Sequence, residues 1–259
     1  MQFTKPLFSF NMTFQALVKI FNTKLYLYLN LFTAIVFSFF TSPSIAQEKQ
    51  KVNYKHLTYL PKNYNADTSK YALVIYLHGG SQKGNDLEKL KVYGLPYLVD
   101  QGKEFDFVMV APQCPEGRYW STENWFDSLY NEVTSTHRID KSRVYVTGIS
   151  MGGYGTYITA LDHPEKIAAI VPLCGGINDS DTTRICTLKD IPILTYHGTA
   201  DNEISIHETE RIEELLKKCN GNITFHRLKD EGHGIQYLYE TKPEIYEWML
   251  KQRKTKSNK

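Results

Sequence analysis

The chain has 259 residues, of which 42% are hydrophobic and 22% are charged, and its formal net charge is +2 at pH 7. This composition is that of an ordinary globular protein and excludes disordered, collagen-like and disulfide-dense classes. The basic residues are scattered until the last few positions, so no nucleic-acid partner is predicted.

The first 46 residues have the organisation of a secretory signal peptide. Three lysines precede an apolar run of 16 residues, and small residues follow up to Ala46. We therefore expect residues 1–46 to be removed, which leaves a secreted or periplasmic domain at 47–259 with no membrane partner. An uncleaved membrane anchor is the alternative, although the run is short for a bilayer span. Met12 is an alternative start to Met1.

Beyond this leader, apolar β-branched runs alternate with helical patterns. An opening segment at 52–60 has alternating side chains and predicts an edge strand that pairs antiparallel. The later runs are apolar throughout, as in strands that are buried on both faces of a sheet. The expected strands lie at 72–77, 107–111, 144–147, 168–171, 191–196 and 223–228, and the expected helices lie near 86–101, 124–136, 151–161, 203–218 and 242–253. This alternation predicts a single α/β domain with a mainly parallel central sheet flanked by helices.

The turns after four of these strands are the predicted location of a functional site. Open α/β sheets bind their ligands beyond the carboxyl ends of the strands. Polar, glycine-rich segments stand at such ends at 78–81, 148–152, 197–201 and 232–234. We expect these four segments to meet at one edge of the sheet.

Residues 148–152 have the pattern G-x-S-x-G, with Ser150 between Gly148 and Gly152. In this pattern the serine sits on a tight strand-to-helix turn, where neighbouring side chains have to be absent for its hydroxyl to be exposed. The predicted strand before it and helix after it supply that context, so Ser150 is the candidate nucleophile. The alternative is an ordinary glycine-rich turn in which Ser150 caps the helix.

A serine nucleophile requires a general base, and His233 is the candidate. The pattern is associated with the chain order Ser, then Asp or Glu, then His. His233 lies between glycines in a loop after the last expected strand, from which it can reach over the sheet edge. The other downstream histidines are poorly placed or lie within a helix or strand: His163, His197, His207 and His226.

The acid that orients this base is expected after the preceding strand, where Asp201 stands. Glu203 is the nearest rival, and it can instead begin the next helix. The other downstream aspartates are less well placed, because Asp190 precedes that strand and Asp179 and Asp181 lie in a polar loop.

Backbone N–H groups are expected to stabilise the negative oxygen that develops in acyl transfer. The N–H of Met151, directly after the nucleophile, is one candidate. The second is expected in the loop after the strand at 72–77, where Gly80 is the first choice and Ser81 the second. His78 is expected to hydrogen-bond within this loop rather than to act as a base.

The four cysteines, Cys114, Cys174, Cys186 and Cys219, all lie in the expected mature domain. Export permits disulfides, and Cys174 and Cys186 are close enough in sequence to pair, although pairing cannot be deduced from the sequence alone. The cysteines form no C-x-x-C pair and have no clustered histidines, which argues against a zinc site. No metal, nucleotide or redox cofactor is predicted.

Six segments of the expected mature domain carry a resemblance to a known family. They read YLHGGSQKGND (76–86), APQCPEGRYW (111–120), DKSRVYVTGISMGGYGT (140–156), VPLCGG (171–176), HGTAD (197–201) and EGHG (231–234). In this order they resemble the secreted α/β-hydrolases related to feruloyl and acetylxylan esterases, polyhydroxybutyrate depolymerases and the group called predicted peptidases. The resemblance implies an α/β-hydrolase fold, with Ser150, Asp201 and His233 as the catalytic triad.

The resemblance further implies that the loop carrying Gln113 and Trp120 faces the substrate. The alternative for Trp120 and Trp125 is packing beneath a loop. The extra binding modules of the family's longer members have no counterpart in this sequence. Because only 51 residues separate Ser150 from Asp201, little chain is left for a sizeable lid domain, and an open cleft suits a bulky polymer or a decorated sugar.

The expected function is that of an exported serine carboxylesterase, which cleaves acyl or feruloyl groups from polysaccharide-derived substrates through an acyl-enzyme. A serine peptidase with the same triad is the runner-up, because ester and amide acyl transfer use the same groups. A non-catalytic binding protein on a hydrolase scaffold is the third possibility, against which the intact triad and both turn glycines argue. The expected partner is a small-molecule or polysaccharide ester.

Overall fold

The computed structural model describes residues 49–66 and 68–254. The expected signal peptide at 1–46 lies outside the described residues. Across the described ranges, none of the helices has both the length and the apolar character needed to cross a bilayer.

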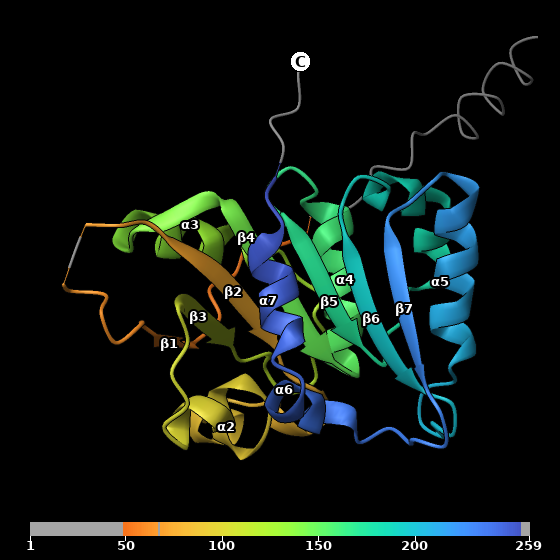
Figure 1. Cartoon of the computed structure of the whole chain (residues 1–259), viewed down its shortest axis with the longest axis horizontal. Coiled ribbons are helices and arrows are strands. Elements are labelled where there is room, and N and C mark those ends of the chain that lie inside the picture. The colour runs from red at the N-terminus through yellow and green to blue at the C-terminus, as the bar shows by residue number, and fades with distance from the viewer. Residues whose placement is uncertain (1–48, 67, 255–259) are drawn as a thin grey trace, which may run out of the picture. The chain divides into compact units, whose positions relative to one another are not determined.

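Seven strands form the central sheet of the described part of the chain, in the order β1-β3-β2-β4-β5-β6-β7 (Figure 1). At one edge β1 (His56–Tyr59) pairs antiparallel with β3 (Phe107–Pro112), and the other neighbouring strands are parallel. The remaining strands are β2 (Tyr71–Leu77), β4 (Ile139–Ile149), β5 (Ala169–Leu173), β6 (Ile193–Gly198) and β7 (Ile223–Leu228). The expected parallel sheet with an antiparallel edge strand is confirmed.

Side chains of successive residues pack into two apolar layers, one on each face of the sheet. Along β2, Leu73 and Ile75 lie in one layer, and Val74 and Tyr76 lie in the other. Helices cover both layers, which is why the strands read as continuous apolar runs. The first layer is covered by α3 (Phe126–Thr136), α4 (Met151–Asp162) and α5 (His207–Lys218), and the second by α2 (Leu95–Asp100), α6 (Leu238–Thr241) and α7 (Glu244–Lys251) (Figure 1).

The single helix expected near 86–101 is two shorter segments. A 3-10 helix, η2 (Leu87–Val92), precedes α2, and Gly94 lies between them with φ 80°. This φ lies in the left-handed region that favours glycine, and a Cβ at Gly94 would overlap the Tyr76 hydroxyl. The chain therefore turns at Gly94, and no continuous helix can run through it.

Two further boundaries differ from expectation in the turns around β6. The polar loop expected around Asp179 is a 3-10 helix, η3 (Asp179–Leu188). The helix expected from 203 begins at His207, because the carboxylate of Asp201 accepts from the backbone N–H groups of the next residues and holds them as a loop.

One disulfide lies in the described part of the chain and joins Cys186 to Cys219, with a Cα–Cα distance of 5.8 Å. The pairing of Cys174 with Cys186 that the sequence allowed is wrong. Cys174 follows the end of β5 at the carboxyl edge of the sheet, whereas Cys186 and Cys219 precede β6 and β7 and lie at the opposite edge. Cys114 and Cys174 are buried free thiols.

Candidate active site

The turn between β4 and α4 carries Ser150. This residue has φ 59° and ψ −119°, a strained conformation for a residue with a side chain, and its N–H donates to the Leu173 carbonyl at 3.0 Å. A Cβ at Gly152 would overlap the Leu77 carbonyl, and a Cβ at Gly148 would overlap the Gly152 carbonyl. The two glycines therefore allow β2, β4 and α4 to approach closely enough to form the turn.

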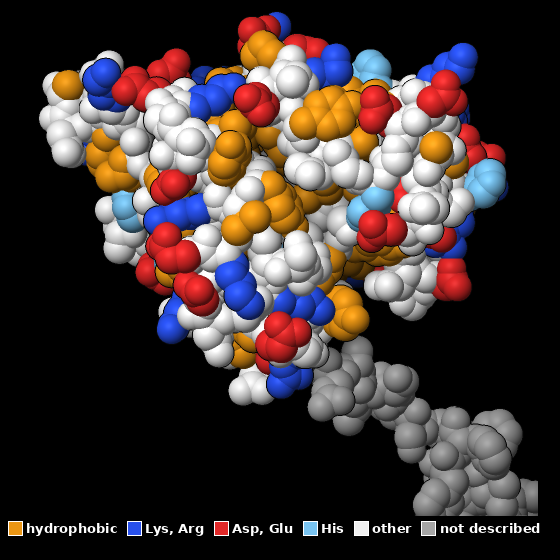
Figure 2. Space-filling model, turned by 90° about the horizontal axis from the view of Figure 1, so that it is seen from below, with side chains coloured by type: hydrophobic (Ala, Val, Ile, Leu, Met, Phe, Trp, Pro, Cys, Tyr) orange, Lys and Arg blue, Asp and Glu red, His pale blue; other side chains and the backbone are white. Residues whose placement is uncertain are grey.

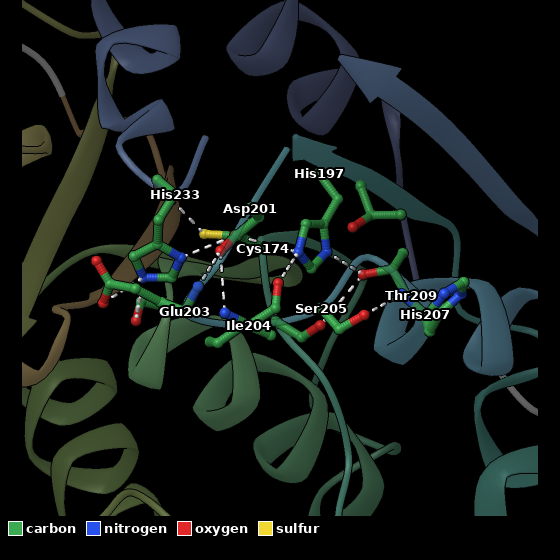
Figure 3. Close-up of polar contacts among 12 residues, drawn as sticks. Cys174, His197, Asp201, Glu203, Ile204, Ser205, His207, Thr209 and His233 are labelled. Carbon is green, nitrogen blue, oxygen red and sulfur yellow. Dashed lines mark hydrogen bonds and ion pairs between the residues drawn. The ribbon is translucent and has the colours of Figure 1, made fainter. Parts of the chain in front are cut away.

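Ser150, His233 and Asp201 form a hydrogen-bonded chain at the carboxyl edge of the sheet. His233 Nε2 lies 2.8 Å from Ser150 Oγ, and His233 Nδ1 lies 2.8 Å from Asp201 Oδ2 (Figure 3). Because a carboxylate can only accept, the Nδ1–H of His233 donates to Asp201, and Nε2 accepts from the Ser150 hydroxyl. The three residues follow β4, β6 and β7, at strand ends where the sequence predicts a site.

Asp201 has a fully buried side chain that three N–H groups hold in place. Its Oδ1 accepts from the backbone N–H groups of Glu203 and Ile204 at 3.0 and 2.9 Å, while Oδ2 faces His233. Burial by itself would raise the pKa of Asp201, but the hydrogen bonds from His233 and from the two backbone groups outweigh it and lower the pKa. Asp201 is therefore an anion, which can orient the His233 ring and stabilise its protonated form.

Glu203 lies on the other side of the His233 ring. Its carboxylate Oε2 is 3.7 Å from His233 Nε2, and its side chain is 69% exposed. Glu203 does not approach Nδ1, which bonds to Asp201. The geometry favours Asp201 over this rival as the acid partner and puts Glu203 at the solvent border of the site.

His197 supports the loop that carries Asp201, a contribution that sequence reasoning missed. Its ring is buried, with Nε2 2.9 Å from the Ile204 carbonyl and 3.3 Å from Asp201, and with Nδ1 2.7 Å from the Thr209 hydroxyl (Figure 3). Burial lowers the pKa of His197, and because a carbonyl can only accept, the Nε2–H of His197 donates to Ile204. The only signal in the sequence is the histidine that opens the HGTAD segment at the end of a buried strand.

Met151 and Gly80 begin helical segments beside Ser150. Met151 is the first residue of α4, and Gly80 is the first residue of a short 3-10 helix, η1 (Gly80–Gln82). The first N–H groups of a helix have no acceptor within that helix and can bind an anion. Gly80 and Ser81 line the same cavity as Ser150. The geometry therefore allows the expected donors to face an oxygen bound at the serine.

Two cavities adjoin Ser150 on the face shown in Figure 2, where apolar side chains reach the surface between charged ones. The first, the aromatic cavity, has a volume of about 470 Å³, and its walls are mainly apolar: Tyr119, Trp120, Met151, Tyr154, Ile158 and Ile204. The second, the loop cavity, has a volume of about 400 Å³, and its walls are turns and polar side chains: Gly79, Gly80, Ser81, Glu203, His233 and Gln236.

Gln113 and Trp120 differ in their relation to these cavities. The Gln113 side chain is buried, and its Nε2 donates to the Gln82 and Asp86 carbonyls at 2.9 and 2.8 Å. Gln113 lines neither cavity and instead ties a neighbouring loop to the end of β3, which corrects its expected substrate-facing placement. Trp120 lines the aromatic cavity and also packs against Trp125 beneath its loop, whereas its expected role in facing the substrate stays a prediction.

His78 joins the walls of the two cavities. Its Nδ1–H donates to the Gly79 carbonyl at 2.7 Å, its Nε2 accepts from the Cys114 N–H at 3.0 Å, and its carbonyl accepts from Trp120 Nε1–H at 3.2 Å. Burial lowers the pKa of His78 to about 4, so the ring is neutral. The expectation that His78 bonds within its loop is confirmed, and neither ring nitrogen is free to act as a base.

Within the described ranges, the side chains whose ligand atoms could share one metal ion are Cys174, Asp201 and His233, with those atoms within 4.8 Å of one another. Asp201 and His233 already bond to each other. Burial raises the pKa of Cys174 to about 12, and its thiol lies 3.7 Å from the His233 carbonyl, to which it can donate. The group suits a hydrogen-bonded triad better than a resident metal ion.

Comparisons with known proteins point to one family. A profile described as phospholipase/carboxylesterase matches residues 105–239. The chain is 28% identical over 158 residues to a bifunctional acetylxylan esterase/xylanase of Neocallimastix patriciarum, covering 59% of this chain and 22% of that protein. It is 27% identical over 180 residues to feruloyl esterase D of Neurospora crassa, covering 62% of this chain and 58% of that protein.

A solved structure extends this similarity to the fold. A thermostable esterase of 28% identity superposes with a TM-score of 0.62, covering 77% of this chain and 59% of that one. The chain spans less than two thirds of the length of each of these three relatives.

Proposed function

Because the chain belongs to the phospholipase/carboxylesterase family and has the α/β-hydrolase fold, we propose that it is a serine hydrolase of carboxylic esters. The observation that carries this proposal is the hydrogen-bonded chain from Asp201 through His233 to Ser150, with both bonds at 2.8 Å. Such a chain makes a serine hydroxyl nucleophilic, because the imidazole takes its proton and the carboxylate stabilises the resulting cation.

In the proposed mechanism, Ser150 Oγ bonds to the ester carbonyl carbon while His233 Nε2 takes the hydroxyl proton. The carbonyl oxygen becomes an anion, which the N–H groups of Met151 and Gly80 stabilise. The bond to the alcohol oxygen then breaks, and the alcohol leaves with the proton from His233. Water attacks the acyl-enzyme in the same way and releases the acid, and Asp201 stabilises the imidazolium in both steps.

The two cavities divide the substrate in this proposal. The alcohol oxygen has to approach His233 and the anionic oxygen has to approach Gly80, and both residues line the loop cavity. The acyl group takes the remaining direction from the carbonyl carbon, toward the aromatic cavity, which neither residue lines. With a volume of about 470 Å³, the aromatic cavity has room for an aromatic acyl group.

We infer that the natural substrates are acyl or feruloyl esters of polysaccharide-derived alcohols. The names of two relatives, an acetylxylan esterase and a feruloyl esterase, support this class. The apolar, ring-lined walls of the aromatic cavity support the feruloyl end of the range, because an aromatic acyl group buries much more apolar surface there than an acetyl group does.

A panel of methyl ferulate, acetylated xylan, 4-nitrophenyl acetate and peptide anilides tests the proposed function. We expect the purified protein to cleave esters faster than anilides, and we expect this activity to disappear in Ser150→Ala. Faster cleavage of the anilides would identify a serine peptidase. A protein that cleaves nothing in the panel would be a binding protein on a hydrolase scaffold.

We further propose that the protein is exported, with residues 1–46 as its signal peptide. The order of basic, apolar and small residues supports this proposal, and the Cys186–Cys219 disulfide suits an oxidising compartment. Mass spectrometry of the protein recovered outside the cytoplasm should identify Gln47 as the first residue. Recovery of a chain that still contains the apolar run would contradict cleavage.

A further inference from the structure

A second hollow adjoins the loop cavity and lies between α2 and α6. This hollow has a volume of about 160 Å³ and shares Tyr93 and Gln236 with the loop cavity. We call it the tyrosine groove, and α2 and α6 lie beside each other in Figure 1. Its other walls come from the end of η2, from α2, from the 3-10 helix η4 (Ile235–Tyr237) and from α6, through Val92, Tyr97, Tyr237 and Glu240.

Exposed apolar side chains gather at the tyrosine groove. Five large hydrophobic side chains are exposed among the described residues, and three of them line it: Val92 at 68%, Tyr97 at 37% and Tyr237 at 39%. Exposed apolar groups that cluster beside a cavity mark a binding surface, whereas scattered ones do not.

Polar groups around the groove suit a ligand with many hydroxyls. Gln236 offers an amide, and the carboxylates of Glu203 and Glu240 border the loop cavity and the groove, respectively. At the junction, the Tyr93 hydroxyl lies 3.2 Å from the Ser81 hydroxyl. Amides and carboxylates accept hydrogen bonds from hydroxyls, and flat tyrosine rings can pack against the C–H face of a sugar ring.

We propose that the tyrosine groove binds a neutral sugar ring that belongs to the alcohol half of the ester. This inference rests on the proposed function, because the alcohol leaves through the loop cavity, with which the groove shares Tyr93 and Gln236. A sugar acid fits less well, since the carboxylates of Glu203 and Glu240 would repel its charge. A plain alkyl alcohol would leave the amide and the carboxylates unused.

The test compares two esters with the same acyl group, methyl ferulate and 5-O-feruloyl-L-arabinofuranose. In the double variant Tyr97→Ala/Tyr237→Ala, kcat/KM for the feruloyl sugar should fall roughly tenfold, mainly through KM, while methyl ferulate changes by less than about twofold. Tyr119→Ala is the matched control, because Tyr119 is an exposed tyrosine that lines the aromatic cavity. Its effect should be equal for both esters, which share their acyl group.

Two kinetic results would overturn the inference: an equal change for both esters in the double variant, or no change for either. If the parent protein cleaves neither ester, feruloyl esters are excluded as substrates of the proposed function, and a binding measurement then tests the groove. Saturation-transfer NMR with an arabinoxylan oligosaccharide should show transfer to the sugar-ring protons in the parent protein and its loss in the double variant. No transfer in the parent protein would reject the groove as a sugar site.

Discussion

The two sides of Ser150 are built from different parts of the fold. The aromatic cavity is walled by α4 and by the segment before α3, where Trp120 and Ile158 are each only 3% exposed and belong to the core. The loop cavity and the tyrosine groove are walled by turns and short helices, with Tyr97 and Tyr237 exposed. Changes at the core residues of the proposed acyl side should therefore disturb packing, whereas the exposed residues of the proposed alcohol side can vary at little cost in stability.

The largest expected effect removes the reaction and leaves both sides intact. Ser150→Ala should lower kcat for methyl ferulate by about a million-fold, because the proposed nucleophile is lost while both cavities keep their walls. Steady-state kinetics measure this loss, and circular dichroism checks that the variant is folded. A loss of only a few-fold would assign the nucleophile to another residue.

Two carboxylates lie beside His233, of which that of Asp201 is buried and that of Glu203 is exposed. Asp201→Asn should lower kcat/KM about ten-thousand-fold, because the ring loses both its orientation and its counter-charge. Glu203→Gln should cost less than about fivefold, because its carboxylate is 69% exposed and solvent screens its charge. Kinetics of both variants with methyl ferulate at about pH 8 make the comparison. A larger loss in Glu203→Gln would reverse the assignment of the acid.

The same two carboxylates indicate how much can be read from the sequence. Asp201 could be preferred to Glu203 as the acid because it stands closer to the end of a buried strand. Ser150 could be proposed as the nucleophile because it lies between the two glycines of the G-x-S-x-G pattern. Both signals are local, since they depend on a strand end and on the room that a turn needs. The order of strands and helices was predictable because it also depends on local signals: each continuous apolar run indicates a buried strand at that position in the sequence.

Features that depend on which segments meet in space were not predictable. The break at Gly94 depends on the Tyr76 hydroxyl, which belongs to a different element. Gln113 turns inward because the carbonyls of a neighbouring loop lie within reach of its amide. Cys174 has no disulfide because it lies at the opposite sheet edge from Cys186. In each case the deciding partner is distant in sequence, so no local pattern encodes it.

Gly155 tests whether the acyl side is tied to the core. A Cβ at this position would lie 2.5 Å from Trp120 Cγ, so Gly155→Ala should push the indole toward the aromatic cavity. Alanine favours a helix interior by about 1 kcal/mol over glycine, but overpacking costs about 1–3 kcal/mol, so we expect a net loss of up to about 2 kcal/mol. The narrower cavity should also lower kcat/KM for methyl ferulate roughly tenfold and leave methyl acetate nearly unchanged.

Gly232→Ala is the matched control on the loop side, where a Cβ would meet no atom within 4 Å. Urea unfolding and kinetics with both esters should give parent-like values for this variant. If Gly155→Ala also kept the parent free energy of unfolding and the parent kcat/KM for methyl ferulate, the two sides would not differ in the way proposed.

The smallest effect at neutral pH concerns His78, whose contacts reach both sides. Burial lowers the pKa of His78 to about 4 in the folded protein, whereas an unfolded histidine titrates near about 6.5. Between these values the unfolded chain binds a proton that the folded chain excludes. The contribution of this pKa shift to stability should therefore be fully present above about pH 6.5. As the pH decreases toward about 4, the free energy of unfolding should fall by about 3 kcal/mol in total.

The variant His78→Gln separates this contribution from the rest of the acid response. Glutamine keeps an acceptor for the Cys114 N–H but has no proton to take up, so the variant should be less stable than the parent near neutral pH and lose less stability on acidification. Urea unfolding from about pH 7 to about pH 5 measures both slopes. If His78→Gln lost stability as steeply as the parent, the pKa of His78 would not be lowered in the folded protein, and the prediction would be wrong.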